Sequence, residues 1–287
     1  MKLLVTGGAG LLGSEFVRAA HQRDGWDVEA PSRTEMDITD ASACARVVAA
    51  ASPDWVIHCA GFTKVDPAES EPDEAMRVNR DGSANVAHAA AAAGAGIVHV
   101  STDYVFDGRK GEPYLPEDPV SPLGAYARSK VAAEEAVLAS VGAGRTPCLI
   151  VRTGWLYGHG RRDFVDLVLD RTAAGESLRI VNDQWGRPTW TRNVARTVLD
   201  LIEAGVRGVV NVSDGGTATW HAFATAIVEA GGLNGVPQGV SSRDYGAPAD
   251  RPLYTVLDLA ATEGELGREM MPWREALRAY LDERSSA

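Results

Sequence analysis

Tyr126, Lys130 and a hydroxyl residue upstream of them have the types and spacing needed to protonate a carbonyl oxygen. On a helix, Tyr126 and Lys130 share one face, one turn apart. An adjacent ammonium lowers the pKa of a tyrosine, which makes Tyr126 a usable general acid. Ser101 and Thr102 end an apolar run, where a hydroxyl can hold a carbonyl oxygen in the crevice of a parallel sheet. A threonine that only satisfies a loop backbone is the alternative.

A glycine-rich segment near the N-terminus has the form of a dinucleotide-binding loop. Gly7, Gly10 and Gly13 lie between an apolar run at 3–6 and a helical pattern from residue 11. Gly7 permits a tight turn, Gly10 lets a pyrophosphate approach the backbone, and Gly13 allows close helix packing. The first N–H groups of the helix are then free to bind the anion. Cofactor contacts are expected from Gly7, Gly10, Leu11, Leu12 and Gly13.

The residues after the second expected strand indicate NADPH. That strand covers residues 27–30 and is followed by Ser32 and Arg33. An acid at its end would bond the ribose 2′-OH of NAD, whereas a guanidinium and a hydroxyl suit a 2′-phosphate. Glu29 lies one residue before the strand end, so NADH stays open as a cofactor. A solvated surface charge is the other interpretation of Arg33.

Short apolar runs alternate with helical patterns, which is typical of a parallel sheet wound by crossover helices. Strands are expected at 3–6, 27–30, 54–59, 97–101 and 147–152, and helices at 11–23, 41–51, 74–93 and 126–138. Loops at 107–124, 153–163, 181–191 and 234–252 are expected, with further helices near 164–174, 192–204, 217–231 and 272–283. We predict an α/β fold with a Rossmann-type doubly wound parallel sheet, the NADP-binding domain, in residues 1–152. Residues 153–287 would form a smaller C-terminal substrate-binding region, and the chain would cross between the two.

Composition and charge exclude several classes of protein. The 287 residues are 45% hydrophobic and 23% charged, as in a globular protein. A net charge of −11 argues against nucleic acids and anionic membranes as partners. No apolar run approaches the roughly 18 residues of a membrane span, and glycines interrupt any signal-peptide core. Three scattered cysteines predict free thiols, a cytoplasmic location and no metal site.

Residues 145–196 are rich in arginine and contain no lysine. Nine arginines minus five acids give this Arg-only stretch a charge of +4. Guanidinium groups bind phosphate or carboxylate through paired hydrogen bonds, so the stretch predicts a grip on such a group. An exposed helix face with ion pairs explains the same charges, and both interpretations stay open.

Together, the glycine-rich loop, the strand-end hydroxyl and the Tyr126–Lys130 pair resemble the extended short-chain dehydrogenase/reductase superfamily. Longer segments resemble the dTDP-4-dehydrorhamnose reductase family: 37–40 (DITD), 65–72 (VDPAESEP), 101–108 (STDYVFDG), 152–158 (RTGWLYG), 183–189 (DQWGRPT) and 273–277 (WREAL). The matches run from residue 2 to about residue 280, so the resemblance covers nearly the whole chain.

The resemblance implies NADPH-dependent reduction of the 4-keto group of a dTDP-6-deoxy-4-hexulose, dTDP-4-dehydro-L-rhamnose or a related deoxysugar, to the alcohol. It selects Thr102 over Ser101 and implies the catalytic set Thr102, Tyr126 and Lys130. Beyond the glycine-rich loop, the expected cofactor contacts are Ser32, Arg33, Asp37, Ile38, Ala60, Gly61, Thr63, Asn79, Tyr126 and Lys130. The implied contacts to the sugar nucleotide are Thr102, Asp103, Tyr104, Trp155, Gln184, Arg187 and Arg251. For Trp155, aromatic packing is the alternative.

Two other functions stay open. One is a non-catalytic NADP-binding regulatory subunit resembling the β subunit of methionine adenosyltransferase, which the intact Tyr126–Lys130 pair disfavours. The other is an epimerase or dehydratase with tightly held NAD, which the lack of an acid after the second strand disfavours. Residues 58–61 (HCAG) and Gly154 depart from the family pattern, where an Asn and a Ser are common, and leave the sugar open. A nucleotide sugar is the expected partner, and a homodimer is compatible with the sequence.

Overall fold

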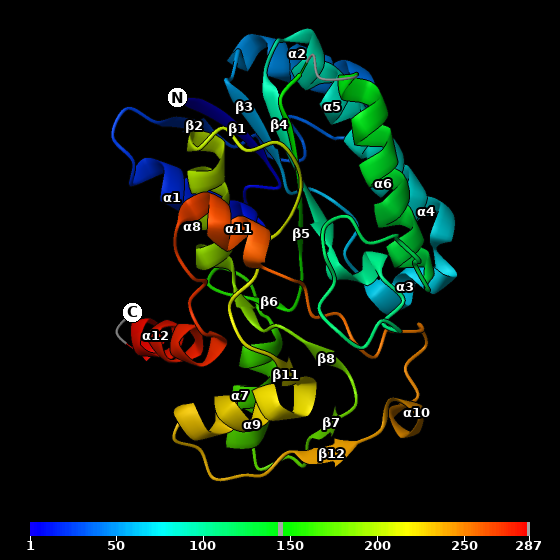
Figure 1. The fold of residues 1–287 in the computed structure, drawn as a ribbon, viewed down its shortest axis with the longest axis vertical. Coiled ribbons are helices and arrows are strands. Elements are labelled where there is room, and N and C mark those ends of the chain that lie inside the picture. Colours follow the sequence, from blue (N-terminus) through cyan, green and yellow to red (C-terminus); the bar gives the residue numbers. More distant parts are fainter. Residues whose placement is uncertain (143–145, 286–287) are drawn as a thin grey trace.

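The computed structural model describes residues 1–142 and 146–285. Within them, a six-stranded sheet has the strand order β10-β5-β4-β3-β1-β2, and every neighbouring pair is parallel (Figure 1). Its strands are β1 (Lys2–Thr6), β2 (Asp27–Glu29), β3 (Trp55–His58), β4 (Gly96–Thr102), β5 (Cys148–Thr153) and β10 (Gly208–Asn211). The predicted Rossmann-type α/β class is confirmed.

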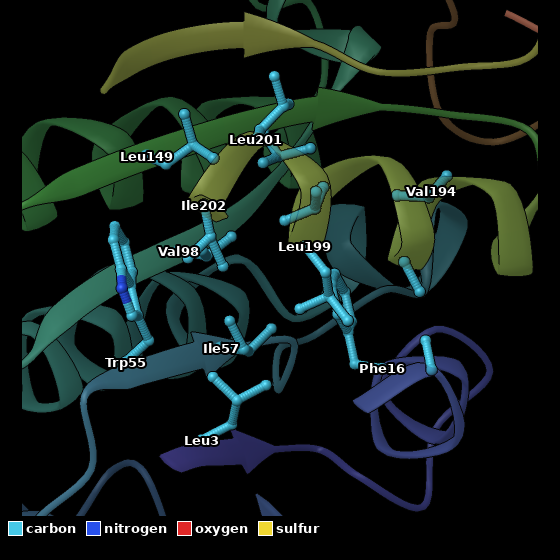
Figure 2. Packing of buried hydrophobic residues seen from close by; sticks show 14 of the residues in the cluster. Leu3, Phe16, Trp55, Ile57, Val98, Leu149, Val194, Leu199, Leu201 and Ile202 are labelled. Carbon is cyan, nitrogen blue, oxygen red and sulfur yellow. The ribbon is translucent and has the colours of Figure 1, made fainter. Parts of the chain in front are cut away.

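Helices cover both faces of the sheet (Figure 1). One face carries α1 (Gly13–His21) and α8 (Thr191–Glu203), and the other carries α2 (Ala41–Ala51), α5 (Gly82–Ala92) and α6 (Ala125–Val141). Figure 2 shows the first face, where Phe16 and Leu199 lie over Ile57 of the sheet. All three side chains are fully buried. Alternation of apolar strands with amphipathic helices therefore produces two hydrophobic layers, one on each side of the strands.

The expected helix at 74–93 is interrupted. It consists of α4 (Pro72–Met76), a π-helical turn (Arg77–Asp81) and α5. The turn contains Asn79, which is buried and whose Nδ2 donates to Phe62 O at 3.0 Å and to Ser129 Oγ at 2.8 Å. The helix widens where one polar side chain connects it to two other segments, as π-turns commonly do.

The C-terminal region contains many short elements. They are β6 (Leu156–Tyr157), α7 (Phe164–Ala173), β7 (Arg179–Val181), β8 (Trp185–Gly186), β9 (Thr189–Trp190), β11 (Ala218–Thr219), α9 (Trp220–Ala230), β12 (Gln238–Val240), α10 (Ser242–Tyr245), α11 (Ala260–Leu266) and α12 (Trp273–Ser285). Three of the expected loops therefore contain strands or a short helix. Strands of two or three residues are too short to show a periodic pattern, so only tertiary pairing reveals them.

The chain returns to the sheet after the expected boundary at residue 152. Strand β10 pairs with β5, with Gly208 opposite Leu149, and α8 packs against α1. A further helix, α3 (Val65–Ser70), follows β3 and packs near α6. In the parts of the chain that the structure describes, no helix is both long enough and apolar enough to cross a bilayer.

Candidate active site

The ends of β4 and α6 bring the expected catalytic residues together. Thr102 is the last residue of β4, and Tyr126 lies in the first turn of α6. The Thr102 side chain lies close enough to the Tyr126 hydroxyl to lower the pKa of Tyr126 in part, and the Tyr104 ring meets the Tyr126 ring edge-on with centroids 6.3 Å apart. Lys130 lies one helical turn beyond Tyr126, and its Nζ donates to Val100 O at 2.7 Å. This is the carboxyl end of a central parallel strand, where ligands of such sheets bind.

Burial dominates the electrostatics of this group. It lowers the pKa of Lys130 to about 8 and raises the pKa of Tyr126 to about 12. The spacing predicts that the ammonium lowers the pKa of Tyr126, and that prediction is wrong because the pKa is raised. The ammonium of Lys130 is directed to a backbone carbonyl, and desolvation of the phenolate is the largest cause of the raised pKa of Tyr126.

His58 is a buried histidine close enough to Lys130 to feel its charge. His58 contacts Thr6 Oγ1 through Nδ1 at 2.7 Å and Ser83 Oγ through Nε2 at 3.0 Å. Burial lowers the pKa of His58 to about 3, so its ring is uncharged near neutral pH. His58 replaces the asparagine that the family pattern led us to expect, and it joins β3 to β1 and α5. The described cysteines at 44, 59 and 148 are unpaired, as predicted.

Asp103 is a buried acid next to Thr102. Thr102 Oγ1 donates to Asp103 Oδ1 at 3.1 Å, and burial raises the pKa of Asp103 to about 6. A Cβ added to Gly154 would lie 2.4 Å from the same carboxylate oxygen. The second departure from the family pattern, Gly154, thus leaves the space that Asp103 fills.

Ser101 serves a different purpose from Thr102. Its hydroxyl donates to Glu134, whose carboxylate also accepts from Arg152 Nη2 at 2.8 Å and Nε at 3.0 Å. Arg152 Nη1 donates to Pro116 O at 2.9 Å. Successive residues of a strand point to opposite faces, so Ser101 joins this buried ion pair while Thr102 faces Tyr126. The sequence showed no signal for the Glu134–Arg152 pair, because its partners come from separate elements.

The glycine-rich loop fits a dinucleotide. Gly7 has φ +70°, and a Cβ added there would lie 2.9 Å from Ala60 N. A Cβ on Gly13 would lie 2.2 Å from Gly7 O, and Gly10 N donates to Gly7 O at 2.8 Å. No side chain caps α1 at Leu12, so its first N–H groups suit a phosphate. The helix begins at Gly13, two residues later than expected, because the loop turns first.

The segment after β2 corrects one expectation. Glu29 is the last residue of β2, so an acid stands at the strand end after all, and its carboxylate pairs with Lys2 Nζ at 2.7 Å. Arg33 is 77% exposed and lies 3.4 Å from Asp37. Ser32 Oγ donates to Glu35. Because the Arg33 guanidinium is exposed and has one weak ion-pair partner, it is free to bind the 2′-phosphate of NADPH.

The other expected cofactor residues differ in exposure. Ile38 is buried against Gly82 of α5. Ala60 lies against Gly7, whereas Gly61 and Thr63 are exposed. Asn79 is directed to the protein rather than to a crevice, and it also accepts from Phe62 N at 2.8 Å. Asn79 therefore supports this site by fixing the backbone of the loop that follows β3.

The expected substrate residues divide into two groups. Arg251 donates to Asp66 Oδ1 at 2.9 Å, and its guanidinium is close enough to Tyr104 to offset part of the rise that burial causes in the pKa of Tyr104, so Arg251 lies beside the catalytic group. The described contacts of Trp155, Gln184 and Arg187 are within the C-terminal region instead. Trp155 stacks on Trp220 with ring centroids 3.8 Å apart; Gln184 donates to Ser242 Oγ at 3.0 Å; Arg187 donates to the carbonyls of Leu257 and Gly216 at 2.8 and 2.7 Å. These contacts do not bring the three side chains to Tyr126.

Most arginines of the Arg-only stretch have structural partners. Ion pairs join Arg152 to Glu134, Arg162 to Asp170, Arg171 to Glu176 and Arg192 to Glu283. Arg179 and Arg187 donate to backbone carbonyls, Arg196 contacts Gln22, and Arg145 lies outside the described residues. Ion pairs therefore account for four of the nine arginines, and neutral acceptors hold three more. In the described part of the chain, no group of three or more His, Cys, Asp or Glu side chains is arranged to hold a metal.

Known proteins are similar in sequence to this chain over nearly its whole length. The family model "RmlD substrate binding domain" matches residues 1–286. The chain belongs to this family. It is 40% identical to the spore coat polysaccharide biosynthesis protein SpsK of Bacillus subtilis, covering 100% of this chain and 99% of that protein. It is also 40% identical to the dTDP-4-dehydrorhamnose reductase of Mycobacterium tuberculosis, covering 98% of this chain and 92% of the relative.

Solved structures of this family have the same fold. A dTDP-4-dehydrorhamnose reductase from Clostridium acetobutylicum superposes with a TM-score of 0.93 at 34% identity, covering 99% of this chain and 100% of that one. The enzyme of that name from Bacillus anthracis, solved in complex with NADP, gives 0.92 at 32% identity and covers 98% and 99%. The family resemblance expected from the motifs is confirmed.

Proposed function

We propose that this protein uses NADPH to reduce the 4-keto group of a dTDP-6-deoxy-4-hexulose, dTDP-4-dehydro-L-rhamnose or a related deoxysugar, to the alcohol. The observation that carries the proposal is the placement of Thr102 and Tyr126 together at the carboxyl end of β4, with Lys130 one helical turn beyond Tyr126. Relatives named dTDP-4-dehydrorhamnose reductase, one of them solved with NADP, support it. The comparisons give no support to a regulatory subunit.

Tyr126 is the proton donor in this proposal. With a pKa of about 12 it keeps its proton at neutral pH, and it can pass that proton to the carbonyl oxygen as negative charge develops there. Thr102 orients the carbonyl, and Lys130 supplies a buried positive charge that stabilises the phenolate left behind. NADPH, when bound, supplies the hydride.

We assign the cofactor to the glycine-rich loop and to the segments after β2 and β3. Asn79 would support these segments. The contacts in them would be Ser32, Arg33, Asp37, Ile38, Ala60, Gly61 and Thr63. The nicotinamide end would lie against Tyr126 and Lys130. Residues 1–152, joined by β10, would form the cofactor domain, and the C-terminal region would hold the sugar nucleotide. Thr102, Asp103, Tyr104 and Arg251 would contact it near the reacting carbon, and Trp155, Gln184 and Arg187 would shape the pocket from behind.

The test offers the purified protein dTDP-4-keto-6-deoxy sugars of both C5 configurations and follows NADPH consumption by nicotinamide absorbance. NMR of the product identifies the sugar and the C4 configuration. Oxidation of NADPH with formation of a C4 alcohol is the expected result. Protein that carries tightly bound NAD and leaves added NADPH unchanged would instead fit an epimerase or dehydratase.

A cytoplasmic location and a homodimer are further proposals. The unpaired cysteines fit a reducing compartment. Cell fractionation tests the location, and light scattering of the purified protein tests the dimer.

A further inference from the structure

The loop 158–162 of the C-terminal region lies across the glycine-rich loop. Arg161 Nε donates to Ala9 O at 3.0 Å. A Cβ added to Gly160 would lie 3.6 Å from Ser14 Oγ. Ala9 and Ser14 flank the start of α1, where the proposed function places the cofactor diphosphate. A guanidinium from a distant part of the sequence is thus held beside that position.

Helices behind the loop hold it in place. Gly158 N donates to Asp163 Oδ2 at 2.7 Å, and Asp163 caps α7. The Tyr280 hydroxyl of α12 donates to Gly158 O at 3.4 Å, and His159 Nε2 lies 3.5 Å from Glu283. The loop is therefore tied to two helices of the C-terminal region before it reaches α1.

Charge distinguishes Arg161 from its neighbour. Over residues 1–142 and 146–285, no carboxylate lies within ion-pair distance of Arg161, whereas Arg162 pairs with Asp170 at 2.7 Å. One N–H of the Arg161 guanidinium is used by Ala9, and a guanidinium has five N–H donors in all. An anion at the start of α1 would supply the negative charge that Arg161 lacks.

We propose that Arg161 binds the diphosphate of the nicotinamide dinucleotide and so couples the C-terminal region to cofactor binding. The inference rests on the proposed function for the identity of the ligand. It gives one arginine of the Arg-only stretch the phosphate-binding role that the sequence predicted, while the ion-paired arginines keep structural roles.

The experiment compares Arg161→Gln with the matched control Arg162→Gln, by fluorescence titration with NADPH and with NADH. Both dinucleotides contain the diphosphate, so Arg161→Gln should raise both dissociation constants by the same factor, roughly tenfold or more. Arg162→Gln should leave both within about twofold, since its charge is exposed and paired. Arg33→Gln should weaken NADPH alone, because only NADPH has a 2′-phosphate. Arg161→Lys, which keeps the charge without the fork, should fall in between.

Unchanged NADH affinity in Arg161→Gln, or an equal loss in Arg162→Gln, would overturn the proposal. Thermal unfolding without cofactor shows whether each variant is folded. If Arg161→Gln weakens the binding of both dinucleotides but the wild-type protein reduces no 4-keto nucleotide sugar, the proposed function is refuted and the role of Arg161 stands. If the wild-type protein is an active reductase but Arg161→Gln binds both dinucleotides normally, the role of Arg161 is refuted and the proposed function stands. Wild-type protein that binds neither dinucleotide would overturn both.

Discussion

The carboxyl ends of β4 and β5 are buried, and so is most of the aromatic cluster of the C-terminal region, which is built around Trp155, Trp220 and Phe223, but the two regions contain opposite kinds of groups. Beside the strand ends, Lys130 and Glu134 of α6 and Arg152 of β5 are ionisable side chains with only 7%, 5% and 4% exposure. In the aromatic cluster, Trp155 and Trp220 stack with an interplanar angle of 9°. The strand ends depend on hydrogen bonds to offset lost solvation, whereas the cluster depends on shape.

This difference separates reactivity from architecture. Burying charge shifts the pKa of a group, and shifted pKa values are what proton transfer uses. Stacked tryptophan rings have no proton to transfer near neutral pH, but they fix the positions of the short strands around them. Substitutions at the strand ends should therefore alter catalysis and its pH dependence, and substitutions in the cluster should alter stability first.

The largest effect is expected at the proton donor. Tyr126→Phe removes the proton that the carbonyl oxygen needs, so kcat should fall by roughly 10²- to 10⁴-fold with little change in NADPH affinity or in Tm. Steady-state kinetics and cofactor titration measure both. Tyr245→Phe, at a tyrosine that is 52% exposed, is the control and should be neutral. A fully active Tyr126→Phe would remove this residue from the mechanism.

Breaking the buried ion pair should cost stability. Glu134→Gln leaves the Arg152 charge buried without its partner, and we expect a loss of about 3–5 kcal/mol in the free energy of unfolding. Glu176→Gln breaks the exposed pair with Arg171 and should cost less than about 1 kcal/mol. Urea denaturation of both variants measures the difference. Similar losses would mean that burial of the strand-end pair has no special weight.

The aromatic cluster should respond to added volume. A Cβ on Gly186 would lie 2.3 Å from the Trp155 ring, so Gly186→Ala should destabilise the fold by about 1–3 kcal/mol. Gly264 of α11 has open space around the added carbon, and Gly264→Ala should stabilise by about 0.5–1 kcal/mol through helix propensity. Opposite shifts in Tm check the pair. Stabilisation by Gly186→Ala would show that the stacked rings move freely.

The smallest effect is expected from pH. Lys130 has a pKa of about 8, so kcat/KM should fall about tenfold by pH 9 as the ammonium is lost, while Tyr126 keeps its proton. Stability should change in the other direction. The folded pKa lies below the ordinary value of 10.5, so the unfolded state binds more protons between pH 8 and 10.5 and the free energy of unfolding rises there. Activity that stays constant through pH 9 would contradict a lysine titrating at this position.

Local signals predicted the regular elements well. The helix at 41–51 has the expected bounds because Asp40 caps it, accepting from the backbone N–H groups of Ser42 and Ala43. The strand ending at Thr102 and the helix carrying Tyr126 were also found, since their patterns are long. The short strands β6, β8 and β9 were missed, because two residues carry no periodic signal.

Site chemistry was predicted less completely than the fold. The Tyr126–Lys130 spacing correctly placed both residues on one helix, but the direction of the Tyr126 pKa shift was wrong, because burial cannot be read from spacing. Glu134 and the neutral His58 shape the same site, and their partners lie on other elements. The predicted preference for NADPH depends on which residue ends the second strand, and the structure ends that strand at Glu29, one residue earlier than predicted.

Residue order alone was enough to predict the main strands and helices, the glycine-rich turn and a tyrosine one helical turn from a lysine, since each depends on neighbours within a few positions. The alternation of strands and helices then indicated a parallel sheet. Tertiary packing decided the rest. It brought Glu134 to Arg152, gave Asp103 the space left by Gly154, and laid Arg161 beside Ala9. Those contacts join residues far apart along the chain, and desolvation and close packing act only once the chain has folded around them.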